Sequence, residues 1–127
     1  MKTLKLSETE IDRAVTRAIA RIPAEIRSHL KNIVISVQKR PSKEMLEEMG
    51  LQRNDILLGV YRGTSLMDRS VFYPPRYPDN IILFQEPLEK VCQTIEELEA
   101  QIEITVVHEV SHFLGMSEEK LAELGYG

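Results

Sequence analysis

The chain has little cysteine and no long apolar segment, and each absence excludes a class of protein. Cys92 is its one cysteine, so no internal disulfide can form, which favours a reducing compartment such as the cytoplasm. We interpret Cys92 as a small core residue. The N-terminal stretch "MKTLKLSETEIDRAV" lacks the apolar run of a secretory signal. No segment approaches the ~20 apolar residues that span a bilayer. We therefore expect a cytoplasmic protein without a membrane partner.

A basic surplus is also missing. The 16 lysines and arginines are outnumbered by 20 acidic residues, which gives a formal net charge of −4. Proteins that bind nucleic acids usually carry excess positive charge to neutralise phosphates, so we expect no nucleic-acid partner. A length of 127 residues is enough for a modest core without disulfide or metal staples. We predict a single domain over residues 1–127.

The periodicity of apolar residues predicts an α+β fold. Ser7 and Glu10 have the spacing of a capping box, which places a helix start there. β-branched or continuous apolar runs indicate strands, and capped amphipathic runs indicate helices. We expect helices over 8–22, 23–31 and 42–50, a helical turn over 87–92, strands over 32–38, 55–63 and 80–85, and an irregular segment over 64–79 in which "SVFY" is a possible short strand.

The last third of the chain predicts two helices that meet at a sharp corner. Thr94 and Glu97 form another capping box, and the apolar residues that follow cover too wide a face for a surface helix. Gly115 stands where a left-handed residue ends a helix. Ser117 then has the position of an N-cap for a final helix that ends at Gly125.

The long helix carries the sequence "HEVSH", which predicts a metal site. His108 and His112 lie only ~40° apart around a helix and one turn apart along it, so both imidazoles can reach one cation such as Zn²⁺. Glu109 lies ~60° from His112, where a carboxylate can act as general base without binding the metal. The corner at Gly115 can return the next helix over the site, so we expect Glu118 as third ligand, with Glu119 as the alternate.

A plainer interpretation is an ordinary polar end on an amphipathic helix. Only three histidines exist and two fall in this motif, which favours the metal site. We interpret the third, His29, as a surface residue. One of the four tyrosines could donate to an oxyanion, but the sequence singles out none. Four glutamates before the motif are most simply a solvated helix face: Glu96, Glu97, Glu99 and Glu103.

The segments "TVVHEVSHFLGMSEEKL", "VYRG" and "YPPRYPDNIILFQEPLEK" resemble the small bacterial zincin-like metallopeptidase family, over roughly residues 55–124. The family motif reads H-E-x-x-H-x-x-G-x-x-[DE]. The resemblance implies a minimal zincin-like fold, with a small twisted mixed sheet packed on N-terminal helices, an active-site helix and a short C-terminal helix. It implies that His108, His112 and Glu118 bind zinc and that Glu109 is the general base.

We therefore predict a zinc-dependent metallopeptidase that hydrolyses peptide or protein substrates, with the substrate extended along "NIILFQ" or "DILLGVYR" as an edge strand. Two alternatives differ in class. A metal-dependent endoribonuclease family has histidines at the spacing of 108, 112 and 118, but this chain has an acid at 118. A non-catalytic module would hold zinc in a closed site, with His29 or Cys92 as a fourth ligand.

Overall fold

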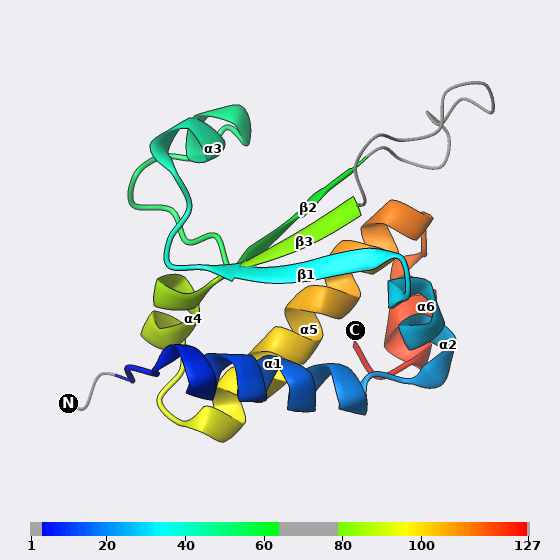
Figure 1. Cartoon of the computed structure of the whole chain (residues 1–127). Helices are drawn as coiled ribbons and strands as arrows, with labels where there is room; N and C mark the ends of the chain where they lie inside the picture. The colour runs from blue at the N-terminus through cyan, green and yellow to red at the C-terminus, as the bar shows by residue number, and fades with distance from the viewer. Residues whose placement is uncertain (1–3, 64–78, 127) are drawn as a thin grey trace.

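The computed structural model describes residues 4–63 and 79–126, and it confirms the predicted α+β fold: one face of a small sheet is covered by two long helices (Figure 1). The elements in chain order are α1 (Glu8–Arg21), α2 (Ala24–Arg27), the 3-10 turn η1 (Ser28–Leu30), β1 (Ile33–Gln38), α3 (Lys43–Glu48), β2 (Gly59–Arg62), β3 (Asp79–Phe84), α4 (Gln85–Val91), α5 (Ile95–Leu114) and α6 (Glu118–Glu123).

Three helices begin at the N-caps discussed in the sequence, whereas the helix predicted over 23–31 is only α2 followed by the turn η1, and α4 begins two residues before the helical turn predicted from 87. The Ser7 hydroxyl accepts the Glu10 N–H, and the Glu10 carboxylate accepts the Ser7 N–H, which completes the capping box of α1. The hydroxyls of Thr94 and Ser117 cap α5 and α6, each accepting the N–H three residues later, but the Glu97 carboxylate accepts the Gln93 N–H, so the predicted box at Thr94 is only half formed. Gly115 ends α5 in the left-handed conformation, with φ 71°. These local signals confirm the predicted corner between α5 and α6.

The sheet has the strand order β1-β3-β2. β1 runs parallel to β3, and β2 runs antiparallel to it. The strand predicted over 80–85 is therefore central, because β3 has a partner on each side. The strand predicted over 55–63 is shorter than expected and is confined to β2, which is an edge strand among the described residues. The predicted "SVFY" strand lies outside the described residues.

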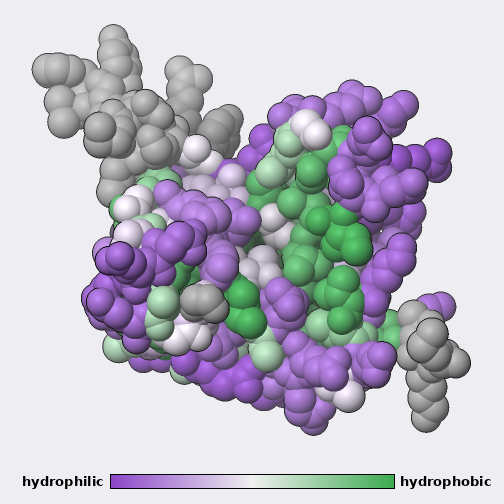
Figure 2. Space-filling view, turned by 180° about the vertical axis from the view of Figure 1, so that it is seen from behind, coloured by the Kyte–Doolittle hydropathy of each residue, from purple (hydrophilic) through white to green (hydrophobic). Residues whose placement is uncertain are grey.

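The core lies between the sheet and the pair α1 and α5. Ile81 and Leu83 point from β3 into it, and Ile102 and Val106 of α5 are fully buried in the same cluster. The reverse side of the molecule shows apolar side chains bordered by hydrophilic ones (Figure 2). Within 4–63 and 79–126, no helix has the length and apolar character needed to cross a membrane.

Candidate functional site

One stripe of α5 faces the edge strand β2. Thr105, Glu109 and Phe113 are spaced four residues apart, so they share one side of the helix. Gly59 of β2 lies against the first of them, because a Cβ on Gly59 would come within 2.9 Å of the Thr105 Cγ2. A glycine is therefore needed for β2 to approach α5 this closely.

Glu109 occupies the centre of this stripe. Its carboxylate accepts a hydrogen bond from the Tyr61 backbone N–H of β2, and its side chain is half-buried. Burial raises the pKa of the Glu109 carboxyl above its ordinary value, while His112, the Tyr61 N–H and His108 pull it down in smaller measure. A carboxylate with a raised pKa is a stronger base at neutral pH.

Tyr61 fixes the edge strand at this point. Its ring stacks on Phe113, with ring centroids 4.6 Å apart and planes 13° apart. Its hydroxyl donates to the Asp79 Oδ2 of β3 over 2.7 Å. β2 is thus attached both to α5 and to β3 where it meets Glu109. Of the tyrosines considered as oxyanion donors, Tyr73 and Tyr77 lie outside the described residues.

The two predicted histidine ligands lie together at the same end of α5. Their ring centroids are 6.3 Å apart, and the rings meet edge to face at 66°. His108 is partly buried and His112 is exposed. The His108 Nε2 lies 3.0 Å from the Tyr126 carbonyl oxygen, which can accept a hydrogen bond from it. Two neutral imidazoles one turn apart are donors that suit Zn²⁺.

The structure does not bring the predicted third ligand to these histidines. Glu118 and Glu119 are exposed at the start of α6. Across the described ranges, no group of three or more His, Cys, Asp and Glu side chains is placed to hold a metal ion. His29 is exposed in η1, whereas Cys92 is a buried core residue, as its interpretation predicted.

A family model of zincin-like metallopeptidases matches residues 30–127. The chain belongs to the zincin-like metallopeptidase family. This confirms the resemblance, and it leaves α1 outside the matched part. The predicted single domain over 1–127 stays a prediction.

A solved structure, described as a conserved hypothetical protein from Thermo thermophilus, is similar in fold. It has a TM-score of 0.54 and 21% identity, and the alignment covers 91% of this chain and 96% of that one. No curated protein matches.

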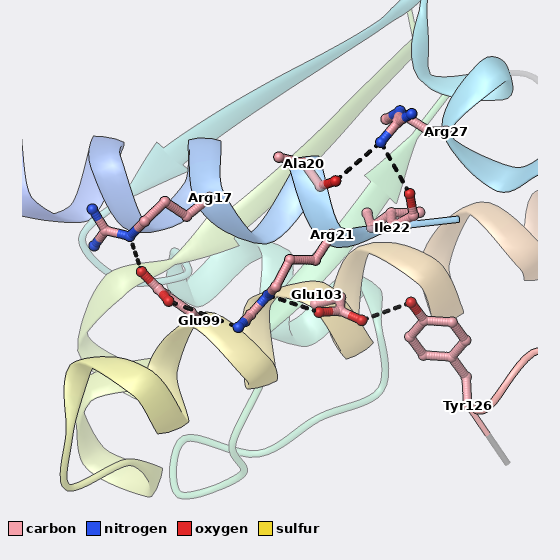
Figure 3. A network of polar contacts seen from close by, with 8 residues as sticks. All are labelled: Arg17, Ala20, Arg21, Ile22, Arg27, Glu99, Glu103 and Tyr126. Carbon is pink, nitrogen blue, oxygen red and sulfur yellow. Dashed lines mark hydrogen bonds and ion pairs between the residues drawn. The ribbon is translucent and has the colours of Figure 1, made fainter. Parts of the chain in front are cut away.

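The prediction that four glutamates form a solvated face is wrong for two of them. Glu99 is 8% exposed and is paired with Arg17 and with Arg21, the latter over 4.0 Å (Figure 3). Glu103 accepts from Arg21 over 3.2 Å and from the Tyr126 hydroxyl over 2.7 Å. Buried carboxylates need such partners, and here α1 supplies them.

Sequence reasoning missed Tyr126 as part of the site. Its backbone carbonyl contacts His108, and its side chain contacts Glu103, although both lie far from it along the chain. A contact made by a carbonyl leaves no residue-type signal. The tyrosine hydroxyl was the one available sign, since a phenol near the end of a chain usually finds a partner when it is buried.

Proposed function

We propose that this zincin-like protein is a cytoplasmic, zinc-dependent peptidase in which Glu109 is the general base. His108 and His112 would hold the zinc ion, with Glu118 as third ligand and Glu119 as the alternate. The observation that carries the proposal is the half-buried Glu109 carboxylate, which lies between two imidazoles and an edge strand.

Zinc, when bound, supplies Lewis-acid polarisation of the scissile carbonyl and a lowered pKa for water. The work of the protein is then proton transfer and orientation. Glu109 takes the proton of the attacking water and delivers it to the leaving amine. The raised pKa of its carboxyl supports both steps, because the group accepts a proton more readily and holds it until the amine departs.

The edge strand β2 supports an extended peptide as the substrate. Of the two strands predicted as candidates, β3 lies between β1 and β2, whereas β2 is an outer strand of the sheet that the described residues form. β2 also contacts Glu109 through the Tyr61 N–H and approaches α5 closely at Gly59. A peptide that adds to this edge as a further strand would lie beside the general base.

Metal content per chain tests the ligand set. We expect about one zinc ion per chain for the parent, as for a catalytic site with three protein ligands. His112→Ala and Glu118→Ala should lose it, and Glu119→Ala should keep it. Retention of zinc by Glu118→Ala together with its loss from Glu119→Ala would reassign the third ligand. A parent that binds no zinc after reconstitution would end the peptidase proposal.

Cleavage assays with Glu109→Gln test the general base. With a peptide library as substrate, we expect the variant to keep its zinc and to lose activity by about 10²–10⁴-fold. Glu123→Gln, which alters an exposed carboxylate of α6, is the matched control and should retain activity. Full activity in Glu109→Gln would exclude this residue as base. Cleavage of RNA and not peptides would favour the endoribonuclease, and zinc binding without cleavage would favour the non-catalytic module.

A further inference from the structure

Tyr126, in the segment after α6, is held at three points. Its hydroxyl donates to the Glu103 Oε2 over 2.7 Å, as Figure 3 shows, and its N–H donates to the Leu121 carbonyl over 2.8 Å. Its carbonyl oxygen lies 3.0 Å from the His108 Nε2. The side chain and the N–H of Tyr126 thus fix the backbone whose carbonyl lies against the first histidine of the candidate metal site.

The anchor for the Tyr126 side chain is a carboxylate that is largely removed from water. The Glu103 side chain is only 20% exposed, and the Arg21 Nε of α1 holds it from the other side over 3.2 Å (Figure 3). A hydrogen bond to an ionised acceptor is roughly twice as strong as one between neutral groups. The interface between α1 and α5 therefore supports the position of Tyr126.

The contact between Tyr126 and His108 uses space that a metal ion needs. Nε2 is the ring nitrogen farther from the backbone of α5, so it is the one that reaches outward to an ion shared with His112. A zinc ion lies about 2.0–2.1 Å from the imidazole nitrogen that binds it. The Tyr126 oxygen, 3.0 Å from Nε2, leaves no room for an ion between the two atoms. The contact and a metal ion on Nε2 therefore exclude each other.

A second observation agrees with this exclusion. Glu118, the expected third ligand, is exposed at the start of the helix that precedes Tyr126. Among the residues that the structure describes, no three potential ligands are grouped around one point. The arrangement therefore does not fit a zinc ion, although the sequence supplies the donors.

We propose that Tyr126 is an autoinhibitory latch, which is anchored on Glu103 and competes with zinc for His108. The latch rests on the proposed function, because it regulates the same site. Binding of zinc then requires that Tyr126 leave His108, so the two events are linked. The observed affinity of a ligand is reduced in proportion to the fraction of molecules that can bind it, so a weaker anchor should give tighter zinc binding.

Two variants weaken the anchor, and a third is the matched control. Tyr126→Phe removes the hydroxyl and keeps the ring and the carbonyl. Glu103→Leu removes the acceptor of that hydroxyl. Glu99→Leu is the control, because it removes the same charge one turn earlier on α5 and also disturbs ion pairs with α1, but the Tyr126 hydroxyl does not bond to Glu99.

Zinc affinity is measured on the full chain by competition with a chromophoric chelator. We expect it to increase by about tenfold in Tyr126→Phe and in Glu103→Leu, since each loses one charge-assisted hydrogen bond of the latch, and to stay unchanged in Glu99→Leu. The direction is informative, because a variant that only loosens the site should bind zinc more weakly.

The ring signals of ¹³C-labelled tyrosine give a readout that does not depend on affinity. Tyr126→Phe identifies the Tyr126 signal by its loss. Addition of zinc to the parent should move this signal toward the position of a solvent-exposed tyrosine. In Glu103→Leu it should lie near that position before zinc is added.

The outcomes separate the latch from the proposed function. Unchanged or weaker zinc binding in Tyr126→Phe and Glu103→Leu, with zinc bound by the parent, would overturn the latch and leave the peptidase proposal standing. A Tyr126 signal that zinc does not move would also overturn it, as would an equal gain in Glu99→Leu. If neither the parent nor any variant binds zinc, the proposed function and the latch fail together.

Discussion

The two halves of α5 differ in how completely their polar and charged side chains are paired with partners. In the first half, Leu98 and Ile102 are fully buried, and the charges beside them are compensated, because Glu99 and Glu103 each contact guanidinium groups of α1. This half has the composition of a structural interface, because each carboxylate removed from water has a partner of opposite charge.

In the second half, the polar and charged side chains are less completely paired with partners. Burial raises the pKa of the Glu109 carboxyl, which shows that its charge is poorly solvated there. Ser111 is fully buried, and its hydroxyl has no hydrogen-bond partner among the residues that the structure describes. Polar groups that a fold leaves under-compensated are typical of functional sites. One helix thus serves stability at one end and, by our proposal, chemistry at the other.

The largest expected effects come from one substitution in each half of α5. Ile102→Ala should lower the free energy of unfolding by about 2–5 kcal/mol, because it opens a cavity in the core, and should leave the zinc stoichiometry of the folded protein unchanged. His112→Ala alters an exposed residue, so it should change stability by less than about 0.5 kcal/mol and abolish zinc binding. Urea unfolding of the metal-free proteins and metal analysis check the pair. Loss of zinc in folded Ile102→Ala would contradict the division of α5 into a structural half and a zinc-binding half.

The corner at Gly115 gives a smaller effect with a matched control. No atom lies within 4 Å of a Cβ built on Gly115, so Gly115→Ala should lose only the cost of a left-handed alanine, about 1–2 kcal/mol. Gly50 has the same conformation, with φ 70° and equally open space, but it follows α3. Gly50→Ala should lose similar stability and keep its zinc affinity, whereas Gly115→Ala should weaken zinc binding by displacing α6. Equal zinc affinities in Gly115→Ala and Gly50→Ala would show that the corner at Gly115 does not position a zinc ligand.

The features that sequence predicted well are local ones. Ser7, Thr94 and Ser117 cap helices because each hydroxyl needs only an N–H three residues away, and Gly115 ends α5 because its own backbone demands it. The spacing that brings His108 to the side of its partner histidine is likewise a property of one helix. Each of these features depends on only a few neighbouring residues, so the sequence is enough to predict it.

The features that it missed depend on contacts between distant segments. Strand order could not be read from the strands themselves, so the central place of β3 was open. The pairing of Glu99 and Glu103 with α1 requires knowing that α1 packs against α5, although the paired residues Arg17 and Glu99 are 82 positions apart in the chain. The contact between the Tyr126 carbonyl and His108 depends on the path that the backbone takes after α6.

Two serines near the site should respond in opposite directions. Ser111→Ala removes a buried hydroxyl that lacks a partner among the described residues, so we expect a gain of up to about 1 kcal/mol in the free energy of unfolding. Ser117→Ala removes the N-cap of α6 and should lose about 1 kcal/mol. Thermal and urea unfolding measure both. A clear loss in Ser111→Ala would show that its hydroxyl has a partner and that the second half of α5 is better compensated than we infer.

The smallest effect is expected at the far end of α1. The backbone and side-chain hydrogen bonds of Ser7 lower the pKa of the Glu10 carboxyl. The unfolded chain therefore binds more protons between that lowered pKa and the ordinary value of 4.5, so this stabilisation is present above pH 4.5 and is lost as the pH falls through the folded pKa. Glu10→Gln should be slightly less stable than the parent at neutral pH, and the gap should close on acidification. Urea unfolding from neutral to acidic pH checks the sign, and a gap that widened in acid would contradict it. Zinc affinity should not change, because the hydrogen bonds of Glu10 run to Ser7 at the start of α1 and not to the histidines of α5.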